Sequence, residues 1–470
     1  METKRYLILS CGIISALPLA GETKEKFNVL FISADDMKPL LGCYGDPMAI
    51  TPSLDNFAKG ATVFTRAYCQ QPVSGPSRAS FLTGRYPDQT GVLRLTDWIR
   101  AKDPDIVTLP QALREAGYTT AGVGKVFQTD RNNLDPLSWS IPPVLYDMKR
   151  SDQYILEENK TDYKSVSNEF TDCPDSMYYD VRIRDAAILR LRELAAEGNP
   201  FFLAVGFHKP HLPFNAPARY RDMYSAELFE IDSTRTEGAP EVAYRPNREL
   251  TEYSDIPDIG PISPEQQKEL KRAYYAAASF SDDNIGKVLE ELRGLGLWDK
   301  TLIVILGDHG YHLGEQRLWC KSTNFEQACR APLLIKRPEQ KKGKVVRRVS
   351  EFAGIFPTVC DLCSVEVPSG VSGHNLFKTS IFRRSYAFSQ IPHTIRIDGK
   401  NTKFTGYSVR DRNWTYVAWF NPDGECSFCE LYKMKGHRVE TENLAGAHKT
   451  AERRLRRILY RHLEEIGVRY

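Results

Sequence analysis

The sequence predicts an α/β fold: a mainly parallel β-sheet sandwiched by helices, followed by a smaller C-terminal α+β subdomain. Short, wholly apolar stretches, such as 27–33, 201–207 and 301–307, alternate with stretches of helical periodicity. Strands that are apolar on both sides occur in parallel sheets whose two faces are both covered. The chain has 470 residues and is 41% hydrophobic, which is sufficient for a large core.

Helix start and stop signals support each of the predicted helices. The signals are proline at a first helical position, a serine or threonine cap before it, and glycine after the last turn. They predict a short helix from Thr51-Pro52 to Gly60, helices at 108–117 and 180–197, and a long helix from Ser263-Pro264 to about Gly294. The apolar runs predict strands at 27–33, 118–123, 201–207 and 301–307. Segment 141–180 is polar, and we expect it to be irregular.

The pattern changes near residue 385. Two β-type runs flank Asp411-Arg412-Asn413, which predicts a hairpin of antiparallel strands. The last stretch predicts an amphipathic helix, since its apolar residues share one helical face; they are Leu455, Ile458, Leu459, Leu463 and Ile466. We therefore expect a catalytic α/β domain at 21–385 and an α+β subdomain at 386–470.

The first twenty residues have the form of a secretory signal peptide. Lys4 and Arg5 precede an apolar run that closes at the small residue Ala20. The sequence therefore predicts a signal peptide at 1–20 and export across the inner membrane to the periplasm. A lipid attachment at Cys11 is the less favoured alternative, because the apolar run before it is short. The sequence has no other stretch long and apolar enough to cross a bilayer.

The cysteines favour a packing role over a metal role. The chain has ten, which become nine without Cys11. Two close pairs, Cys360/Cys363 and Cys426/Cys429, have the spacing of zinc ligands. Cys360, however, lies in an apolar stretch that predicts a buried helix. Core cysteines, with at most one disulfide, are the favoured interpretation.

Ionisable residues follow four of the predicted strands within two residues. They are Asp35-Asp36 after 27–33, Lys125 after 118–123, His208 after 201–207, and Asp308-His309 after 301–307. Ligands of parallel α/β sheets bind beyond the carboxyl ends of the strands, so these residues predict a functional site. The net charge of +3 gives no field for nucleic acid, so an anionic substrate must be met by local cations.

The predicted site contains hard metal ligands. Asp35, Asp36 and Asp308 offer carboxylate oxygens, which suit Ca²⁺ or Mg²⁺ better than zinc. His309 either joins these ligands or hydrogen-bonds another of them.

The stretch 71–85, QPVSGPSRASFLTGR, adds an anion site to this edge. Pro76 suits a first helical turn, so Ser74 is expected just before a helix whose N-terminus attracts anions. Arg78 adds a bidentate cation for a tetrahedral oxyanion. Ser74 is a candidate nucleophile, although a plain hydroxyl needs activation.

This stretch resembles the signature of the type I sulfatase family. That signature is Cys or Ser, any residue, Pro-Ser-Arg, and then Thr-Gly-Arg, which match here at 74–78 and 83–85. The resemblance implies an alkaline-phosphatase-like fold. It also implies that a formylglycine-generating maturase converts Ser74 to 3-oxoalanine (formylglycine), whose hydrated aldehyde is the nucleophile.

Further stretches resemble iduronate-2-sulfatases and bacterial uronate-2-O-sulfatases; they are NVLFISADDMKPLLGCYGD, SFLTGRYPD, GKVF, FFLAVGFHKPHLPF, GDHGYHLGE and WCKSTNF. The resemblance implies that one Ca²⁺ ion is held by Asp35, Asp36, Asp308 and His309 with the modified Ser74. It implies further that Arg78 and Lys125 contact the formylglycine diol and the sulfate, that His208 protonates the leaving oxygen, and that Lys321 binds a sulfate oxygen.

Two positions depart from the iduronate-2-sulfatase pattern. Serine at position 74 replaces the usual cysteine, so maturation depends on the host. Gln128 stands where those enzymes carry a histidine, and glutamine cannot carry a proton. His211 could replace it as proton acceptor or could be a turn residue. His312 is expected to be structural.

The expected function is hydrolysis of the 2-O-sulfate of a uronic acid, iduronate or unsaturated hexuronate, in heparin or heparan sulfate fragments. The expected partner is a sulfated oligosaccharide. Three alternatives remain: a sulfatase for another sulfated glycan, a phosphonate or phosphate monoester hydrolase of the same fold, and an inactive carbohydrate-binding protein if Ser74 is unmodified.

Overall fold

A computed structural model describes residues 26–161, 163–231, 234–245, 249–378, 385–434 and 439–469. The expected signal peptide and Cys11 lie outside these residues.

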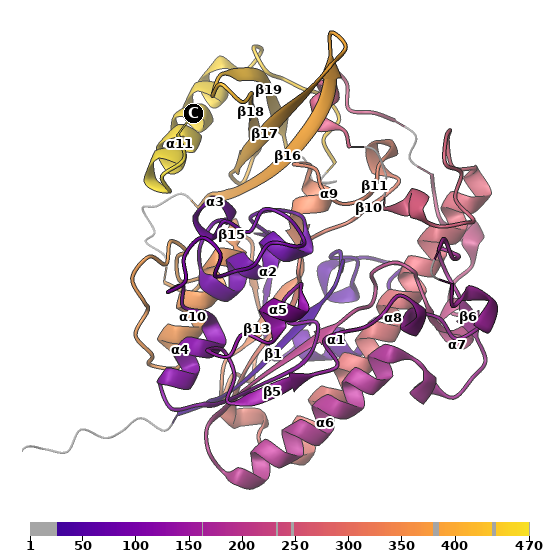
Figure 1. Ribbon diagram of the computed structural model, residues 1–470, viewed down its shortest axis with the longest axis vertical. Helices are drawn as coiled ribbons and strands as arrows, with labels where there is room; N and C mark the ends of the chain where they lie inside the picture. The colour runs from indigo at the N-terminus through magenta and orange to yellow at the C-terminus, as the bar shows by residue number, and fades with distance from the viewer. Residues whose placement is uncertain are drawn as a thin grey trace, which may run out of the picture.

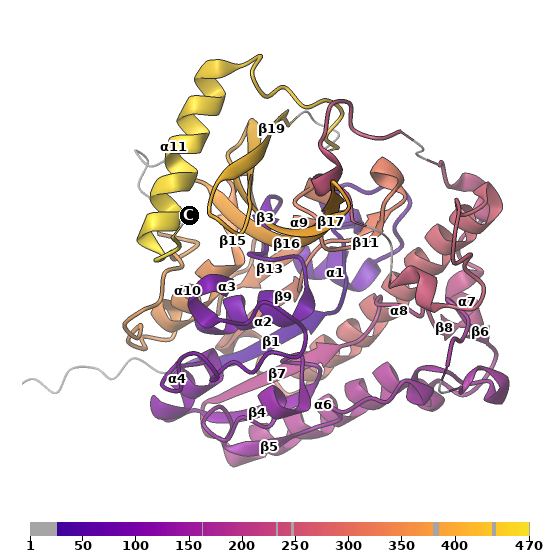
Figure 2. The ribbon, with the colours of Figure 1, turned by 45° about the horizontal axis from the view of Figure 1, so that its top comes forward.

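An eight-stranded sheet forms the centre of the molecule (Figures 1 and 2). Its strands, in spatial order, are β14 (Lys344–Val346), β2 (Thr62–Phe64), β13 (Leu333–Lys336), β9 (Thr301–Gly307), β1 (Asn28–Ala34), β7 (Phe201–Phe207), β4 (Thr119–Gly124) and β5 (Ile141–Val144). The run from β9 to β5 is parallel, whereas β13 is antiparallel to both of its neighbours. The sheet is therefore mainly parallel, as predicted.

Both faces of the central part of the sheet are buried, which explains why β1, β7 and β9 are largely apolar. Along β1, Val29 and Phe31 join one hydrophobic cluster, while Leu30 and Ile32 join the cluster on the opposite face. The first face is covered by α2 (Ser74–Thr83), α4 (Leu109–Glu115) and α10 (Ile355–Leu362). The second is covered by α1 (Pro52–Ala58), α6 (Tyr179–Glu197) and α8 (Pro264–Gly294).

Two of the long or regular helices begin with a side-chain cap, whereas Thr51, the N-cap residue of α1, makes no cap hydrogen bond. Thr108 Oγ1 accepts a hydrogen bond from the backbone N–H of Gln111 at the start of α4. Ser263 accepts one from Gln266 at the start of α8, and proline follows each cap. These contacts satisfy donors that a helix N-terminus leaves unpaired.

The C-terminal part is a four-stranded antiparallel sheet with one helix (Figure 1). Its strands are β16 (Ala387–Ile397), β17 (Lys400–Arg410), β18 (Trp414–Phe420) and β19 (Cys426–Lys433), and α11 (Lys449–Glu465) packs on one face. The other face contacts Leu318 and Phe325 of the α/β part. The division at residue 385 stays a prediction.

Short elements complete the fold: α3 (Pro87–Thr90), α5 (Asp130–Asn133), α7 (Ala218–Arg221), α9 (Glu326–Cys329), and strands β3 (Ala67–Tyr68), β6 (Phe170–Thr171), β8 (Ala216–Pro217), β10 (His312–Leu313), β11 (Trp319–Cys320), β12 (Arg330–Ala331) and β15 (Ser350–Glu351). Segment 141–180 is largely irregular, but its first residues form β5, the edge strand of the main sheet. A four-residue strand containing two prolines gives little apolar pattern, which is why the sequence did not reveal it.

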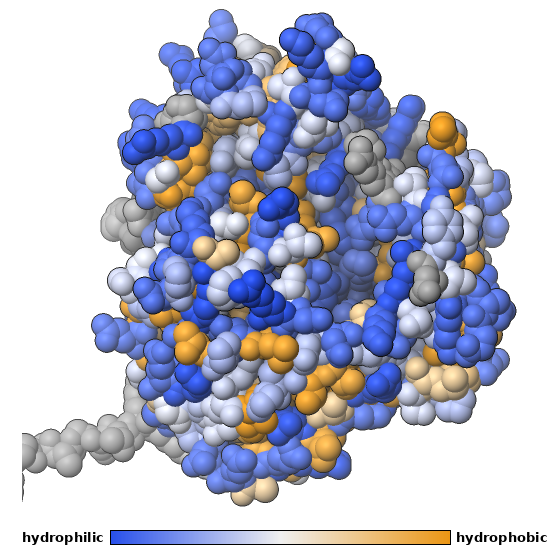
Figure 3. All heavy atoms as spheres, in the orientation of Figure 1, coloured by the Kyte–Doolittle hydropathy of each residue, from blue (hydrophilic) through white to orange (hydrophobic). Residues whose placement is uncertain are grey.

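The face shown in Figure 3 is mainly hydrophilic, with hydrophobic residues in small groups. Within the described part of the chain, no helix has the length and apolar content of a membrane span.

We predict that Gly206→Ala destabilises the fold. A Cβ atom at Gly206 in β7 would lie 1.9 Å from the carbonyl oxygen of Lys125, so the ends of β7 and β4 would have to separate. Such overpacking costs about 1–3 kcal/mol or more, which a lower urea midpoint would report. Gly294→Ala is the control, because nothing lies within 4 Å of its added Cβ. Equal midpoints for the two variants would show that the close approach is not required.

Candidate functional site

The site lies where four neighbouring strands of the main sheet end. β9, β1, β7 and β4 are adjacent and parallel, so their carboxyl ends meet at one edge. The residues that follow these strands are buried there: Asp35 and Asp36 after β1, Lys125 after β4, His208 after β7, and Asp308 and His309 after β9. The structure also brings Ser74, Arg78 and Lys321 to this edge, through the contacts described next.

Ser74 is the first residue of α2 and is buried against the carboxylates. Its hydroxyl donates to Asp35 Oδ1 (3.0 Å) and lies 3.1 Å from His309 Nε2. The helix begins one residue earlier than expected, with Val73 as the N-cap. Pro76 is still within the first turn, where its missing N–H costs nothing. The start of α2 therefore points the residue 74 side chain at the centre of the cluster.

Arg78 is the buried counter-charge of the cluster. Its Nε donates to Asp308 Oδ2 (3.2 Å), and its Nη2 donates to Asp35 Oδ1 (3.1 Å). Its Nη1 donates to Ser33 Oγ and to the carbonyl oxygens of Lys125 and Val126. The guanidinium thereby ties α2 to the ends of three strands, and most of its five donors are used within the protein.

Asp35 is held in its ionised form. Burial would raise its pKa, but the charges of Lys125 and Arg78 outweigh burial and keep the pKa well below its usual value. Lys125 Nζ donates directly to Asp35 Oδ2.

Asp36 has a different environment. It adopts a left-handed backbone conformation with φ of 58°. Its carboxylate accepts two hydrogen bonds from Lys321 Nζ, at 2.9 and 2.8 Å. Burial raises the pKa of Asp36, because it outweighs the opposing charge of Lys321. Lys321 is shared, since it also donates to Glu249 Oε1 at 2.9 Å.

The donor set of this cluster fits a hard cation. Ligand atoms of Asp36, Asp308 and His309 lie within 4.8 Å of one another. His309 Nδ1 donates to the carbonyl oxygen of Gly310 (2.9 Å), which leaves Nε2 facing Asp36 Oδ1 at 3.3 Å. An imidazole nitrogen and carboxylate oxygens that face one another in this way can hold a cation between them. Charge alone does not require a cation here, because Arg78, Lys125 and Lys321 already pair with the carboxylates.

Backbone hydrogen bonds hold His208 in position, and Nε2 of its ring is available for a substrate. The backbone N–H groups of His208 and Lys209 donate to Asp180, at 3.1 and 2.8 Å, which fixes the loop after β7. Within the described residues, the buried His208 Nε2 has no hydrogen-bond partner. Burial, followed by the charge of Lys125, lowers the pKa of His208 well below its usual value. The imidazole is therefore neutral in the free protein.

The other polar residues discussed from the sequence differ in their surroundings. His211 Nε2 lies 3.0 Å from Glu249 Oε1 and 3.6 Å from Asp36 Oδ2, which places it in the cluster. Gln128 is half-buried, and its Oε1 has no partner among the described residues. His312 is buried and lies 2.8 Å from Thr323 Oγ1, and burial lowers its pKa to about 3, which fits a structural role.

Sequence reasoning missed Glu249 and Asp180. Glu249 follows a polar stretch without strand or helix signals, and no motif distinguishes it. Asp180 lies at the start of α6, where an acidic residue is ordinarily explained by the helix dipole. Only the tertiary structure shows that each contacts the site.

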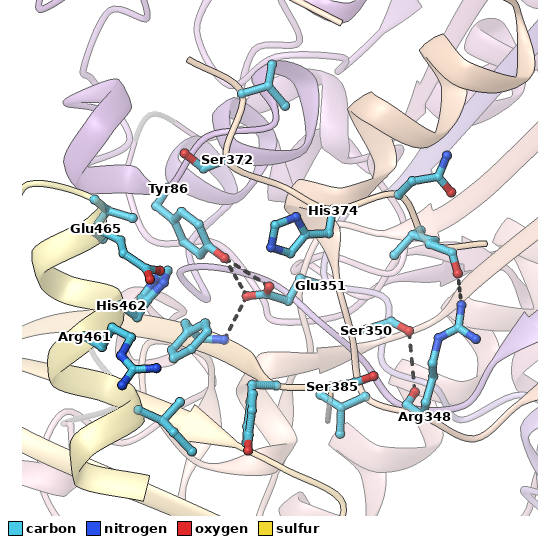
Figure 4. A pocket seen from close by; sticks show the side chains of 18 of the residues that line it. Tyr86, Arg348, Ser350, Glu351, Ser372, His374, Ser385, Arg461, His462 and Glu465 are labelled. Atoms are coloured by element: carbon cyan, nitrogen blue, oxygen red, sulfur yellow. Dashed lines mark hydrogen bonds between the residues drawn. The ribbon is translucent and has the colours of Figure 1, made fainter. Parts of the chain in front are cut away.

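A cavity of about 1200 Å³ lies elsewhere, between α11 and the segment around β15 (Figure 4). In it the Tyr86 hydroxyl donates to both carboxylate oxygens of Glu351, at 3.1 and 3.0 Å. Burial raises the pKa of Glu351 to about 7. None of the residues predicted for the site lines this cavity. The candidate site therefore remains the strand-end cluster.

We predict that Arg78→Met destabilises the folded protein by about 3–5 kcal/mol, because it leaves buried carboxylates without their counter-charge. Urea unfolding would measure the loss. Arg94→Met is the control, since Arg94 pairs with Asp97 at the surface and such pairs contribute at most about 1 kcal/mol. Similar small losses in both variants would contradict the role assigned to Arg78.

Comparisons with known proteins show the family of this chain. The sulfatase family model matches residues 27–365. The chain is 30% identical to iduronate 2-sulfatase of Homo sapiens, over 94% of this chain and 96% of that protein.

Two solved structures show the same fold. One is a phosphonate monoester hydrolase from Silicibacter pomeroyi, with a TM-score of 0.75 at 24% identity, covering 94% of this chain and 96% of that one. The other is a 2-O GAG sulfatase, with a TM-score of 0.71 at 20% identity, covering 94% and 93%. With the family match over most of its length, this chain belongs to the sulfatase family of sulfuric ester hydrolases.

Proposed function

We propose that this sulfatase hydrolyses the 2-O-sulfate ester of a uronic acid, iduronate or unsaturated hexuronate, in heparin or heparan sulfate fragments. The observation that carries the proposal is the position of Ser74, which is buried between Asp35 and His309. Arg78 and Lys125 bind the same Asp35 carboxylate. The uronate 2-O specificity is supported by the similarity to iduronate 2-sulfatase along nearly the whole chain.

Two groups complete the proposed site. Sulfatases generally use formylglycine and a metal ion. Formylglycine at position 74 would supply an oxygen nucleophile as its hydrated aldehyde, and a Ca²⁺ ion would supply positive charge next to the sulfate. Asp35, Asp36, Asp308 and His309 are the residues that would hold the ion.

The residues of the chain would bind the sulfate and move one proton. Lys125 donates to Asp35 and Lys321 donates to Asp36, so both ammonium groups lie in the cluster and would contact the sulfate oxygens. Such fixed charges stabilise a transition state in which negative charge shifts. His208 is neutral in the free protein, but a bound sulfate would raise its pKa, so that Nε2 would carry a proton to the leaving sugar oxygen.

A panel of defined substrates tests this proposal. Sulfate release from a disaccharide with a 2-O-sulfated uronate is compared with release from isomers sulfated at the glucosamine 6-O or N position. We expect kcat/KM to favour the 2-O isomer by about 100-fold or more. Preference for another isomer would leave the chain a sulfatase of different specificity. The panel also includes a phosphonate monoester. Preference for that substrate would favour the alternative function of a phosphonate monoester hydrolase, a class that includes a solved structure of similar fold.

We predict that Ser74→Ala eliminates turnover and leaves sugar binding measurable. The variant loses the nucleophile but keeps Lys125, His208 and Lys321. Ser74→Cys is the matched variant, and it should be active when made in a host that matures cysteine-type sulfatases. Turnover by Ser74→Ala within about tenfold of wild type would show that residue 74 is not the nucleophile.

We predict that removal of divalent metal abolishes turnover and that Ca²⁺ restores it. His309 Nε2 and the neighbouring carboxylate oxygens face one another and offer the donor set of a hard cation, whose charge the reaction would use. Activity is measured after chelation and dialysis, with the metal content of each sample determined in parallel. Full turnover in a sample confirmed to be free of metal would disprove the requirement.

We predict that His208→Ala loses about two to four orders of magnitude in kcat on a sulfated uronate, the usual scale of general acid catalysis. An alkoxide leaving group needs the proton, whereas a nitrophenolate does not, so the loss on an aryl sulfate should be far smaller. Both losses are measured on one preparation. Equal losses would mean that His208 positions the sulfate or supports the fold.

A further inference from the structure

The pair Cys426/Cys429 is brought together by an irregularity in β19. Residues three apart in a regular strand point to opposite faces. Here the pairing of β18 with β19 shifts between Trp419 and Phe420, so that Phe428 opposes Trp419 while Cys426 opposes Phe420. Ser427 is the extra residue of this β-bulge. The bulge turns Cys426 to the same face as Cys429, the face on which α11 packs.

The two sulfur atoms are in contact and accessible. Cys426 Sγ lies 3.4 Å from Cys429 Sγ. Cys426 is exposed and Cys429 is half-buried. A disulfide bond requires the sulfurs at about 2.05 Å, so a closing movement of about 1.4 Å is needed. Oxidants can reach this pair from solvent through Cys426.

A zinc site is the competing explanation for this spacing. Zinc in a structural site takes four ligands. Within the described ranges, the groups of three or more residues that could hold a metal contain no cysteine. A pair without further ligands favours sulfur–sulfur chemistry over metal binding.

We propose that Cys426 and Cys429 form a reversible disulfide across the β19 bulge, by exchange with a small-molecule or protein disulfide. The Cys429 thiolate attacks one sulfur of the oxidant and releases its other sulfur as a thiol. The Cys426 thiol then loses its proton and attacks the Cys429 sulfur, which breaks the mixed disulfide and releases the second thiol. Starting from the Cys429 thiolate and the Cys426 thiol, the pair gives up two electrons and one proton; with a second proton from solvent, the oxidant is reduced to two thiols.

The surroundings of Cys429 support its role as the first nucleophile. Hydrogen bonds from Cys426 and from the Tyr416 hydroxyl (3.3 Å) outweigh burial and lower the pKa of Cys429 to about 6. This lowering favours the thiolate, which is the reactive form.

The second CxxC pair provides a contrast within the same protein. Cys360 and Cys363 are both buried at the end of α10, where burial raises their pKa values to about 12 and about 11. Buried thiols with raised pKa values are unreactive. Identical spacing therefore gives a reactive pair on β19 and an inert pair on α10.

Peptide mapping tests the proposal on the full chain. The reduced protein is equilibrated with oxidised glutathione, quenched with acid, denatured, and alkylated with N-ethylmaleimide. Trypsin leaves each pair within one peptide, residues 413–433 and residues 349–378. We expect the first peptide to be unlabelled and about two mass units lighter than its reduced form, and the second to carry two labels. Dithiothreitol should restore both labels on the first.

Single variants separate the two steps. In Cys426→Ser, exchange should stop at a glutathione adduct on Cys429, because the resolving thiol is missing. Two labels on the 413–433 peptide of the wild-type protein at every glutathione ratio would overturn the proposal. A disulfide from Cys426 to any other cysteine would also overturn it.

Discussion

The buried guanidinium of Arg78 is the interaction on which the site depends. Two of the four parallel strands, β1 and β9, deliver carboxylates to one edge, and these carboxylates repel one another. Arg78 bonds Asp35 and Asp308 and reaches the backbone beyond β4. Because Arg78 lies one turn after Ser74, the same interaction fixes the start of α2 against the strand ends. Charge compensation and placement of residue 74 are therefore one structural feature.

The two adjacent aspartates show how this compensation is distributed. Asp35 has both Lys125 and Arg78 beside it, and its pKa is lowered. Asp36 depends on Lys321, which also serves Glu249, and burial raises the pKa of Asp36. In the proposed function a metal ion would take over the charge of the carboxylates, and the two lysines would turn to the sulfate. The metal would free the lysines to bind the sulfate, and the sulfate would draw the lysines away from the carboxylates that hold the metal. Each ligand would therefore strengthen the binding of the other.

Much of the fold could be predicted from local sequence, because its signals are local. Apolar strands, proline starts and serine or threonine caps located β1, β7, β9, α4 and α8 within a residue or two. The strand-end residues followed from the topology of a parallel sheet. The edge strand β5 could not be predicted, because its prolines remove the pattern. Glu249 and Asp180 could not be predicted either, since only tertiary contacts bring them to Lys321 and to the loop at His208.

The account depends most directly on the chemical state of residue 74. Intact-peptide mass spectrometry of active enzyme, purified from a host that matures serine-type sulfatases, measures that state. The account predicts a peptide around Ser74 that is about two mass units lighter than the serine form, as oxidation of the hydroxyl to an aldehyde requires. A preparation that hydrolyses sulfate esters at full rate with only unmodified serine at position 74 would contradict it.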